Sequence, residues 1–343
     1  MTFEDSDPIG EFDVIRRFFS PSKGSPSQGH FSQNPVLLGI GDDCALMNSP
    51  PPGEVYAITS DMLVAGRHFF KDANPTLLGH KCLAVNLSDL AAMGAKPIAY
   101  NLSIALPDID IAWLEQFSNG LHTIADVHDC TLIGGDTTAG PLTISITAIG
   151  TVHPQQALRR SGALVGDDIW LSNTVGDARL VLGFRRGEWN TPLPWQELAI
   201  RMDGPTPRID LGLGLRGVAS SAIDVSDGLL GDLGHILDAS KVSAKIWIDD
   251  IPCSPPLREV SLELRRLCTL KGGDDYELCF TAPQKNRSLV QSLSEHLHLP
   301  LTRIGEVTKR IPEQPNMALL DKDNVPLPVD LAKQYMRSFD HFK

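Results

Sequence analysis

The chain has 343 residues, of which 42% are hydrophobic and 21% charged, as is ordinary for a globular protein. Its net charge of −12 argues against a nucleic-acid partner, which would need a basic surface. Every apolar stretch is interrupted well short of about 18 residues and the acidic N-terminus lacks an apolar signal core, so we expect a cytoplasmic protein without a membrane span.

The first half of the chain alternates predicted strands and helices. A short helical pattern at 12–19 precedes a Ser/Pro/Gly segment, SPSKGSPSQG, and we expect the loop at 20–33 to be a mobile lid. Helices are predicted at 75–93, where Pro75 opens the pattern, and at 111–127. Strands are predicted at 36–40, 55–59, 98–106, 131–133 and 142–151.

The second half follows the crossover HPQQALRRSGALVGDD and has the same mixture of elements. Strands are predicted near 169–172, 222–225, 244–248, 276–281, 302–308 and 316–320, and helices near 177–187, 207–218, 228–239, 256–268 and 285–296. We therefore predict an α+β (mixed α/β) fold with two domains, 1–152 and 153–343.

Six segments place an acid near glycine, most of them directly after an apolar run. They are GIGDDCA (39–45), TSDMLVAGRHF (59–69), VNLSDLAAMGAKP (85–97), IGGDTTAGP (133–141), AIDVSDGLLGDLG (222–234) and KGGDDYELCF (271–280). Any one of them is explained by turn chemistry, because Asp and Gly both tolerate turn conformations. As a set, four of them deliver acids from predicted strand ends to a common rim, which favours a shared site.

Asp89, Asp224 and Asp227 have their own alternatives. Asp89 is predicted inside a helix beside an apolar stripe, and could instead be an ordinary surface acid of that helix. Asp224 and Asp227 flank Ser226 where a helix opens, so they could serve as N-caps or lie beside a bound anion.

Several carboxylates in one cleft repel each other unless cations intervene. Oxygen ligands suit Mg²⁺, which binds through a few carboxylates together with substrate phosphates. The six cysteines are scattered without a Cys-x-x-Cys pair, and neither Cys nor His clusters with the acids, so we expect structural cysteines and no zinc. The pattern predicts a site with several Mg²⁺ ions that holds a nucleoside triphosphate.

Other nucleotide-binding motifs are missing or misleading. There is no G-x-x-x-x-G-K-[ST] and no protein-kinase H-R-D or D-F-G set. A G-x-G-x-x-G occurs at 212–217, but it follows a predicted turn and helix start, so a dinucleotide site is not expected. Arg159 and Arg160 could meet phosphate or could simply be solvated.

These motifs together resemble the thiamine-monophosphate kinases, a family related to aminoimidazole ribonucleotide synthetase and selenophosphate synthetase. The resemblance runs from GEFDVIRRFF to the terminal FDHF, and AGRHF, LIGGDTT and GGDDYEL are its most specific pieces. It implies ATP-dependent phosphorylation of thiamine phosphate to thiamine diphosphate, in thiamine diphosphate biosynthesis. It also implies a homodimer, with an N-terminal domain for Mg-ATP binding and dimerisation and a C-terminal α+β domain that completes the active site.

The resemblance also implies roles for particular residues. The implied metal ligands are Asp43, Thr59 (through a main-chain oxygen), Ser60, Asp61, Asp89, Asp136, Asp224 and Asp227. The implied ATP contacts are Gly135, Asp136, Arg160 and Ser226. The implied contacts to thiamine phosphate are His68, Asp274 and Phe339.

Three positions depart from the family pattern or carry an alternative. Thr59-Ser60-Asp61 replaces Thr-Thr-Asp and keeps the hydroxyl. Asp274 stands where the family has Glu, which is one methylene longer. Phe339 is expected to stack on the thiamine ring, and its alternative is a hydrophobic plug at the C-terminus.

The chemistry needs no protein nucleophile or base. The attacking atom is an oxygen of the substrate phosphate, which is already largely dianionic at neutral pH because its second pKa is about 6. We therefore expect direct in-line transfer without a phosphoenzyme. The alternatives are a related ATP-dependent synthetase with another acceptor, and a non-catalytic Mg²⁺-binding regulatory protein.

Overall fold

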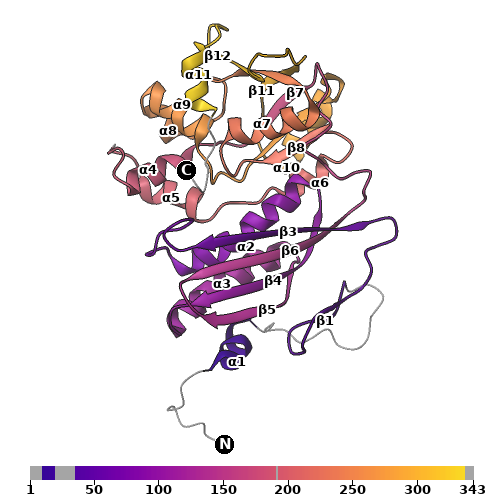
Figure 1. The fold of residues 1–343 in the computed structure, drawn as a ribbon, viewed down its shortest axis with the longest axis vertical. Helices are drawn as coiled ribbons and strands as arrows, with labels where there is room; N and C mark the ends of the chain where they lie inside the picture. The colour runs from indigo at the N-terminus through magenta and orange to yellow at the C-terminus, as the bar shows by residue number, and fades with distance from the viewer. Residues whose placement is uncertain (1–9, 20–34, 191, 337–343) are drawn as a thin grey trace, which may run out of the picture. The chain divides into compact units, whose positions relative to one another are not determined.

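The computed structural model describes residues 10–19, 35–190 and 192–336. The chain divides into two compact units, one formed by residues 1–86 and 97–151 and the other by 87–96 and 152–343. Both mix helices and strands (Figure 1), which confirms the predicted mixed α/β fold. Within the described residues, no helix combines the length and apolarity needed to cross a membrane. The predicted lid at 20–33 lies outside the described residues.

The first unit is built on a four-stranded sheet with the order β3-β6-β4-β5. Its strands are β3 (Val55–Val64), β6 (Thr143–Val152), β4 (Lys96–Leu106) and β5 (Thr131–Ala139). Helices α2 (Pro75–Ala92) and α3 (Ile111–Val127) cover one face (Figure 1). A small pair, β1 (Val36–Leu38) and β2 (Leu46–Met47), and the short helices α1 (Glu11–Val14) and η1 (Ile15–Phe19) complete the unit.

Alternation and helix capping explain these elements. Ile144, Ile146 and Ala148 of β6 are fully buried and alternate with more exposed residues, as expected for a strand with one covered face. The carboxylate of Asp110 accepts the N–H of Trp113 and so starts α3. Because β4 and β5 pair in parallel and α3 connects them, the three form a crossover unit.

The second unit is built on a six-stranded sheet whose neighbours are antiparallel, except that β12 and β9 are parallel. Its strands, in sheet order, are β12 (Met317–Leu320), β9 (Ser243–Trp247), β11 (Leu301–Thr308), β7 (Asp168–Ser172), β10 (Leu278–Ala282) and β8 (Ser221–Asp224). Its helices include α4 (Asp177–Arg185), α5 (Trp195–Asp203), α6 (Ile209–Gly214), α7 (Leu229–Ser240), α8 (Pro255–Glu259), α9 (Leu262–Lys271), η2 (Gln284–Asn286), α10 (Arg287–Leu297) and α11 (Val329–Tyr335).

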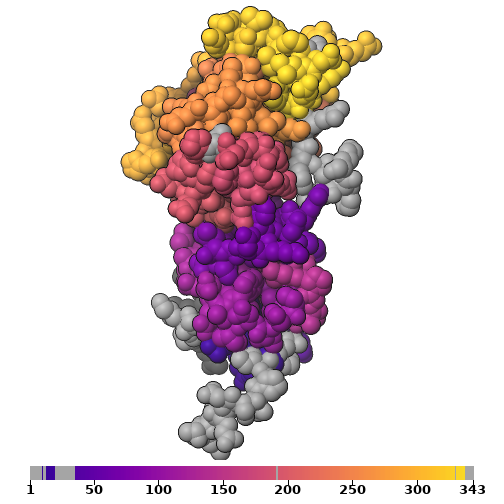
Figure 2. Space-filling model, turned by 90° about the vertical axis from the view of Figure 1, so that its left-hand side faces the viewer, coloured from indigo at the N-terminus to yellow at the C-terminus, as the bar shows by residue number. Residues whose placement is uncertain are grey.

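The core of the second unit lies between this sheet and α7. Leu229, Leu233, Ile236 and Leu237 form one stripe of α7, at the spacing expected for an amphipathic helix. They are buried in one cluster with residues of the sheet such as Ile246. Residues near the end of the described chain, coloured yellow, lie together on the surface of this unit (Figure 2).

Several boundaries differ from the sequence prediction. Strand β3 extends to Val64, past its predicted end at residue 59, and β5 extends to Ala139, past its predicted end at residue 133. The predicted helix at 256–268 is two helices, because Ser261 accepts the N–H of Leu264 and caps a second one. Helices α5 and α11 were not predicted. The G-x-G-x-x-G at 212–217 starts inside α6, so it is not a strand-to-helix turn, as expected.

Candidate functional site

Asp43 lies in an exposed turn of the first unit. The carboxylate of Asp42 accepts the backbone N–H of Asp43 at 3.0 Å, and the backbones of Asp42 and Ile40 form an isolated β-bridge. Both acids are exposed. Asp42 therefore shapes the turn and leaves the Asp43 carboxylate as the one that the turn presents.

Strand β3 separates Ser60 from its two neighbours. Side chains alternate along a strand, so Thr59 and Asp61 share a face with the buried Leu63, and Ser60 points to the opposite face. There the Ser60 Oγ lies 2.9 Å from the Thr147 hydroxyl. The side chains of Ser60 and Asp61 therefore cannot converge on one ion from this strand, and Asp61 is the stronger candidate ligand.

Asp136 lies in an edge strand, beside a bulge. The pairing of β5 with β4 shifts register so that Ile133 is an extra residue, and β5 then continues through Gly135 and Asp136. Gly135 has φ +147°, and a Cβ there would lie 1.7 Å from the carbonyl oxygen of Leu102. Only glycine fits, and the strand then carries Asp136 with its side chain exposed to solvent.

His68 closes the turn that follows β3. Its Nδ1 accepts the N–H of Val64 at 2.9 Å, and the N–H of Gly66 donates to the carbonyl of Phe69 at 2.8 Å. The neutral imidazole in this arrangement carries its proton on Nε2. The AGRHF segment thus fixes the ring orientation of a half-buried histidine, a property useful for a substrate contact.

In the second unit, the last turn of α2 is tied to the end of β8. The buried hydroxyl of Ser88 donates to Oδ2 of the buried Asp224 at 2.8 Å. Asp89 follows Ser88 and is half-buried, so it is not a fully solvated helix acid. This bond brings two predicted metal ligands, Asp89 and Asp224, onto connected elements.

The loop between β8 and α7 is shaped by Asp232. Its Oδ2 accepts the backbone N–H groups of Ser226, Asp227 and Gly228, each at 3.1 Å. Asp232 is only 3% exposed, and burial together with the nearby charge of Asp227 raises the pKa of its carboxyl to about 7, although the three donors oppose the rise. Ser226 and Asp227 therefore lie on a loop whose backbone is held in place by the Asp232 carboxylate.

A second loop, 272–277, is hydrogen-bonded to the first. The N–H of Asp274 donates to the carbonyl of Ser226, and the N–H of Tyr276 donates to that of Val225, both at 2.8 Å. Asp274 has φ +65°, a conformation that Asp adopts more readily than most residues. Its Oδ1 accepts the Tyr276 hydroxyl at 3.0 Å, so the shorter acid is held in a defined orientation.

Four buried residues of the candidate site were missed from the sequence. Besides Ser88 and Asp232, they are Asp275, whose carboxylate accepts the N–H of Gly176 at 2.9 and 3.0 Å, and Glu277. Burial raises the pKa of Asp275 well above its usual value. Glu277 is 1% exposed, and its carboxylate accepts hydrogen bonds from the side chains of Ser172, Asn173, Arg201 and Arg208. An acid in the first turn of α7 was the available signal for Asp232.

The predicted metal ligands are divided between the units. Asp43, Thr59, Ser60, Asp61 and Asp136 belong to the first unit, and Asp89, Asp224 and Asp227 to the second. Across the described ranges, no three His, Cys, Asp or Glu side chains are grouped so that they could hold a metal ion. The donor chemistry nevertheless fits Mg²⁺, because the candidates are oxygen ligands with no His or Cys among them.

Two further predicted residues are Arg160 and Phe339. Arg160 is exposed, and its carbonyl accepts the hydroxyl of Ser240 at 3.2 Å. Phe339 falls outside the described residues. All six cysteines are free thiols, and five of them are buried, as expected for structural residues.

The fold and these motifs define the class of protein. Residues 41–152 match the N-terminal domain of AIR synthase related proteins, and 208–313 match the C-terminal domain. The thiamine-monophosphate kinase of Escherichia coli K12 is 44% identical over 97% of this chain and 98% of its own length. That of Haemophilus influenzae is 39% identical over 98% of both.

Solved structures agree with the sequence matches. Thiamine-monophosphate kinase from Stenotrophomonas maltophilia K279a has a TM-score of 0.78 and 47% identity, covering 84% of this chain and 92% of that one. A structure described as AaThiL complexed with AMPPCP and TMP has a TM-score of 0.71 and 27% identity, covering 88% and 92%. The chain belongs to the thiamine-monophosphate kinase family.

Proposed function

We propose that this chain transfers the γ-phosphoryl group of ATP to thiamine phosphate, giving thiamine diphosphate and ADP. The observation that carries the proposal is near-full-length similarity to thiamine-monophosphate kinases, at 44% identity for that of E. coli. A relative described as complexed with AMPPCP and TMP supports both substrates. The protein would then act in thiamine diphosphate biosynthesis, in the cytoplasm.

The transfer is direct. An oxygen of the acceptor phosphate bonds to the γ-phosphorus while the bond from that phosphorus to the β,γ-bridging oxygen breaks, and ADP leaves. The acceptor oxygen is already ionised at neutral pH, so no protein base or nucleophile is required. Several bound Mg²⁺ ions would supply the charge neutralisation that lets two polyanions approach.

The acids of each unit have separate parts in this proposal. Asp43, Asp61 and Asp136 of the first unit would hold Mg²⁺, and Asp89, Asp224 and Asp227 would do so in the second. Thr59 would assist through its main-chain oxygen. Ser60 is the weakest of the proposed ligands, because its side chain lies on the other face of β3.

Substrate contacts complete the proposal. ATP would meet Gly135, Asp136, Arg160 and the loop at Ser226. Thiamine phosphate would meet His68, Asp274 and Phe339. The Tyr276 hydroxyl supports the role of Asp274, because it holds the carboxylate in one orientation.

A homodimer formed through the first unit is also part of the proposal. Ile58 and Met62 of β3 are 66% and 58% exposed and share the face of Ser60. Two large apolar side chains on one exposed strand face favour burial against another protein surface. A second copy of the chain is the partner that the family resemblance implies.

Product analysis tests the reaction. The purified chain is mixed with Mg–ATP and thiamine phosphate, with free thiamine as a parallel acceptor. We expect thiamine diphosphate from thiamine phosphate alone, with one ADP per product. If ATP binds but no product forms, the acceptor is wrong and a related synthetase reaction becomes the better hypothesis.

Acid-to-amide variants test the roles of the carboxylates. Asp43→Asn, Asp89→Asn and Asp136→Asn should each lower kcat by about 100-fold or more, because charge stabilisation dominates this chemistry. Asp108→Asn, an exposed acid outside the six segments, is the matched control. Near-native rates in all three variants would remove the metal-ligand assignment. A covalent phospho-aspartate trapped during turnover would rule out direct transfer.

A further inference from the structure

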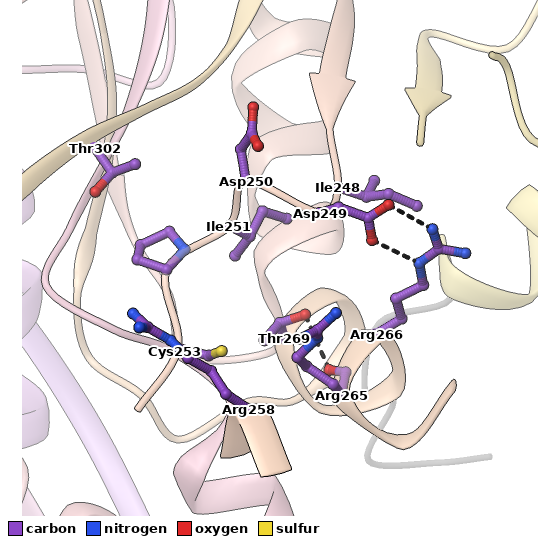
Figure 3. Close-up of a pocket in the computed structure, with 11 residues that line it drawn as sticks. Ile248, Asp249, Asp250, Ile251, Cys253, Arg258, Arg265, Arg266, Thr269 and Thr302 are labelled. Carbon is purple, nitrogen blue, oxygen red and sulfur yellow. Dashed lines mark hydrogen bonds and ion pairs between the residues drawn. The ribbon is translucent and has the colours of Figure 1, made fainter. Parts of the chain in front are cut away.

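A pocket of about 430 Å³ opens in the second unit, where the segment after β9 meets α8 and α9 (Figure 3). Residues 248–253 form one wall, and arginines from both helices form another. None of these residues belongs to the six acid-bearing motifs of the proposed kinase site. The pocket therefore calls for its own explanation.

The arginines of this pocket are not equivalent. Arg266 is neutralised by Asp249, because its Nε and Nη2 donate to the two carboxylate oxygens at 2.9 and 2.7 Å (Figure 3). Asp249 also accepts the N–H of Lys322 at 2.9 Å, so its oxygens are already used. In contrast, Arg258 and Arg265 form no ion pair within 4.0 Å among the described residues, although Arg265 is near enough to Asp249 to lower the pKa of its carboxyl and Asp250 also lines the pocket.

The free arginine charge is accompanied by an apolar surface. Burial raises the pKa of the Cys253 thiol, and the nearby charges of Arg258 and Arg265 oppose this rise. Ile251 and Cys253 are each 5% exposed and line the pocket together with Pro252. Two guanidinium groups next to apolar side chains fit a ligand that has an anionic group on an apolar body.

Sheet topology separates this pocket from the loop that carries Asp227. Strands β8 and β9 run in the same direction, with β10, β7 and β11 between them. Four strand spacings of about 4.8 Å place the two strand ends about 19 Å apart. The pocket after β9 is thus a separate place on the same edge of the sheet.

We propose that this pocket binds a small organic anion, a phosphate monoester or a carboxylate on an apolar group. Arg258 and Arg265 contact the anionic group, and Ile251, Pro252 and Cys253 contact the apolar part. The Asp249–Arg266 pair fixes the pocket wall and takes no part in the contact. The net charge of the chain is −12, so a net positive pocket is a local exception that selects for anions.

Calorimetric titration of the full chain tests the proposal with phenyl phosphate and benzoate as probes and benzyl alcohol as the uncharged comparison. A Mg–ATP analogue is kept at saturation to occupy the proposed nucleotide site. We expect saturable binding of one or both anions, at one site per chain, and none of benzyl alcohol. The double variant Arg258→Ala/Arg265→Ala should weaken binding by about tenfold or more, because both charge-assisted contacts are lost.

Arg310→Ala removes the same charge from an exposed position that pairs with Asp238, and is the matched control. It should change binding by less than about twofold. If the double variant does not fold, NMR shifts of the Nε–H groups of Arg258 and Arg265 on titrating the native chain replace it. Absence of saturable anion binding, undiminished binding in the double variant, or unshifted arginine resonances would each overturn the proposal.

The kinase assay keeps this test independent of the proposed function. The double variant should phosphorylate thiamine phosphate within about twofold of the native rate, since neither arginine belongs to the proposed catalytic set. Absence of kinase activity in the native chain would refute the proposed function. The anion-binding measurements would still decide the proposal for this pocket.

Discussion

Asp232 supports the loop that carries Ser226 and Asp227, and its truncation has a calculable cost. Asp232→Ala leaves three backbone N–H groups without the oxygen that they share at 3.1 Å. Gly228 is buried, so its unpaired donor costs about 1–3 kcal/mol, whereas water partly replaces the bond at the two half-buried residues. Removing a buried carboxyl offsets part of this, and we expect a net loss of about 2 kcal/mol.

The same truncation should weaken the proposed Mg²⁺ site, because Asp227 is no longer held in place. We expect the Mg²⁺ concentration for half-maximal kinase rate to rise by about tenfold, as is usual when an outer-shell partner is lost. Urea unfolding followed by circular dichroism measures the first effect, and initial rates over a Mg²⁺ series measure the second. Asp232→Asn keeps an acceptor oxygen and should lie between the native chain and Asp232→Ala.

Asp238→Ala is the control on the same helix, α7, because the Asp238 side chain is 61% exposed and pairs only at the surface. It should cost less than about 1 kcal/mol and leave the Mg²⁺ requirement unchanged. The reasoning is refuted if Asp232→Ala unfolds at the native urea concentration and keeps the native Mg²⁺ requirement.

Three further predictions concern other contacts. Gly135→Ala should lower stability by about 3 kcal/mol or more and raise the KM for ATP, because a Cβ meets backbone there; a native thermal midpoint would contradict it. Ser88→Ala should cost about 1–3 kcal/mol by removing the buried donor to Asp224, with chemical unfolding as the measurement and an unchanged midpoint as the contrary result. The hydrogen bonds from Arg266 hold the pKa of Asp249 below its usual 3.8. The ion pair between them therefore stabilises the folded chain fully at pH values above 3.8, and this stabilisation is lost as the pH falls through the folded-state pKa of Asp249. Arg266→Gln should therefore cost about 1–3 kcal/mol at pH 7 and less at pH 2–3; an equal cost at both, from urea unfolding, would argue against the pair.

The sequence predicted most elements because their burial is periodic. Helix 111–127 was placed at its observed bounds, since apolar residues recur at helical spacing. The structure shows in addition that Asp110 caps its start. Strand β5 was cut short because Gly134 and Gly135 are typical of turns. In the structure these two glycines permit a bulge and a close approach of two backbones, and a local sequence pattern cannot distinguish this arrangement from a turn.

Within the candidate site, the sequence indicated which acids to consider but not how they are supported. The bond between Ser88 and Asp224 joins residues 136 positions apart, so no local pattern reveals it. The opposite orientations of Ser60 and Asp61 became visible only when the strand was seen to continue past 59. The pocket between residues 248–253 and the arginines of α8 and α9 likewise depends on tertiary packing.

The hydrogen bonds that join loop 225–228 to loop 272–277 limit how acceptor preference can be redesigned. The N–H groups of Asp274 and Tyr276 donate to the carbonyls of Ser226 and Val225, so the backbone of each loop fixes the position of the other. A library that varies the length of the second loop would also move the first. New acceptors are therefore better sought by exchanging side chains at fixed loop length, with insertions and deletions placed in other loops.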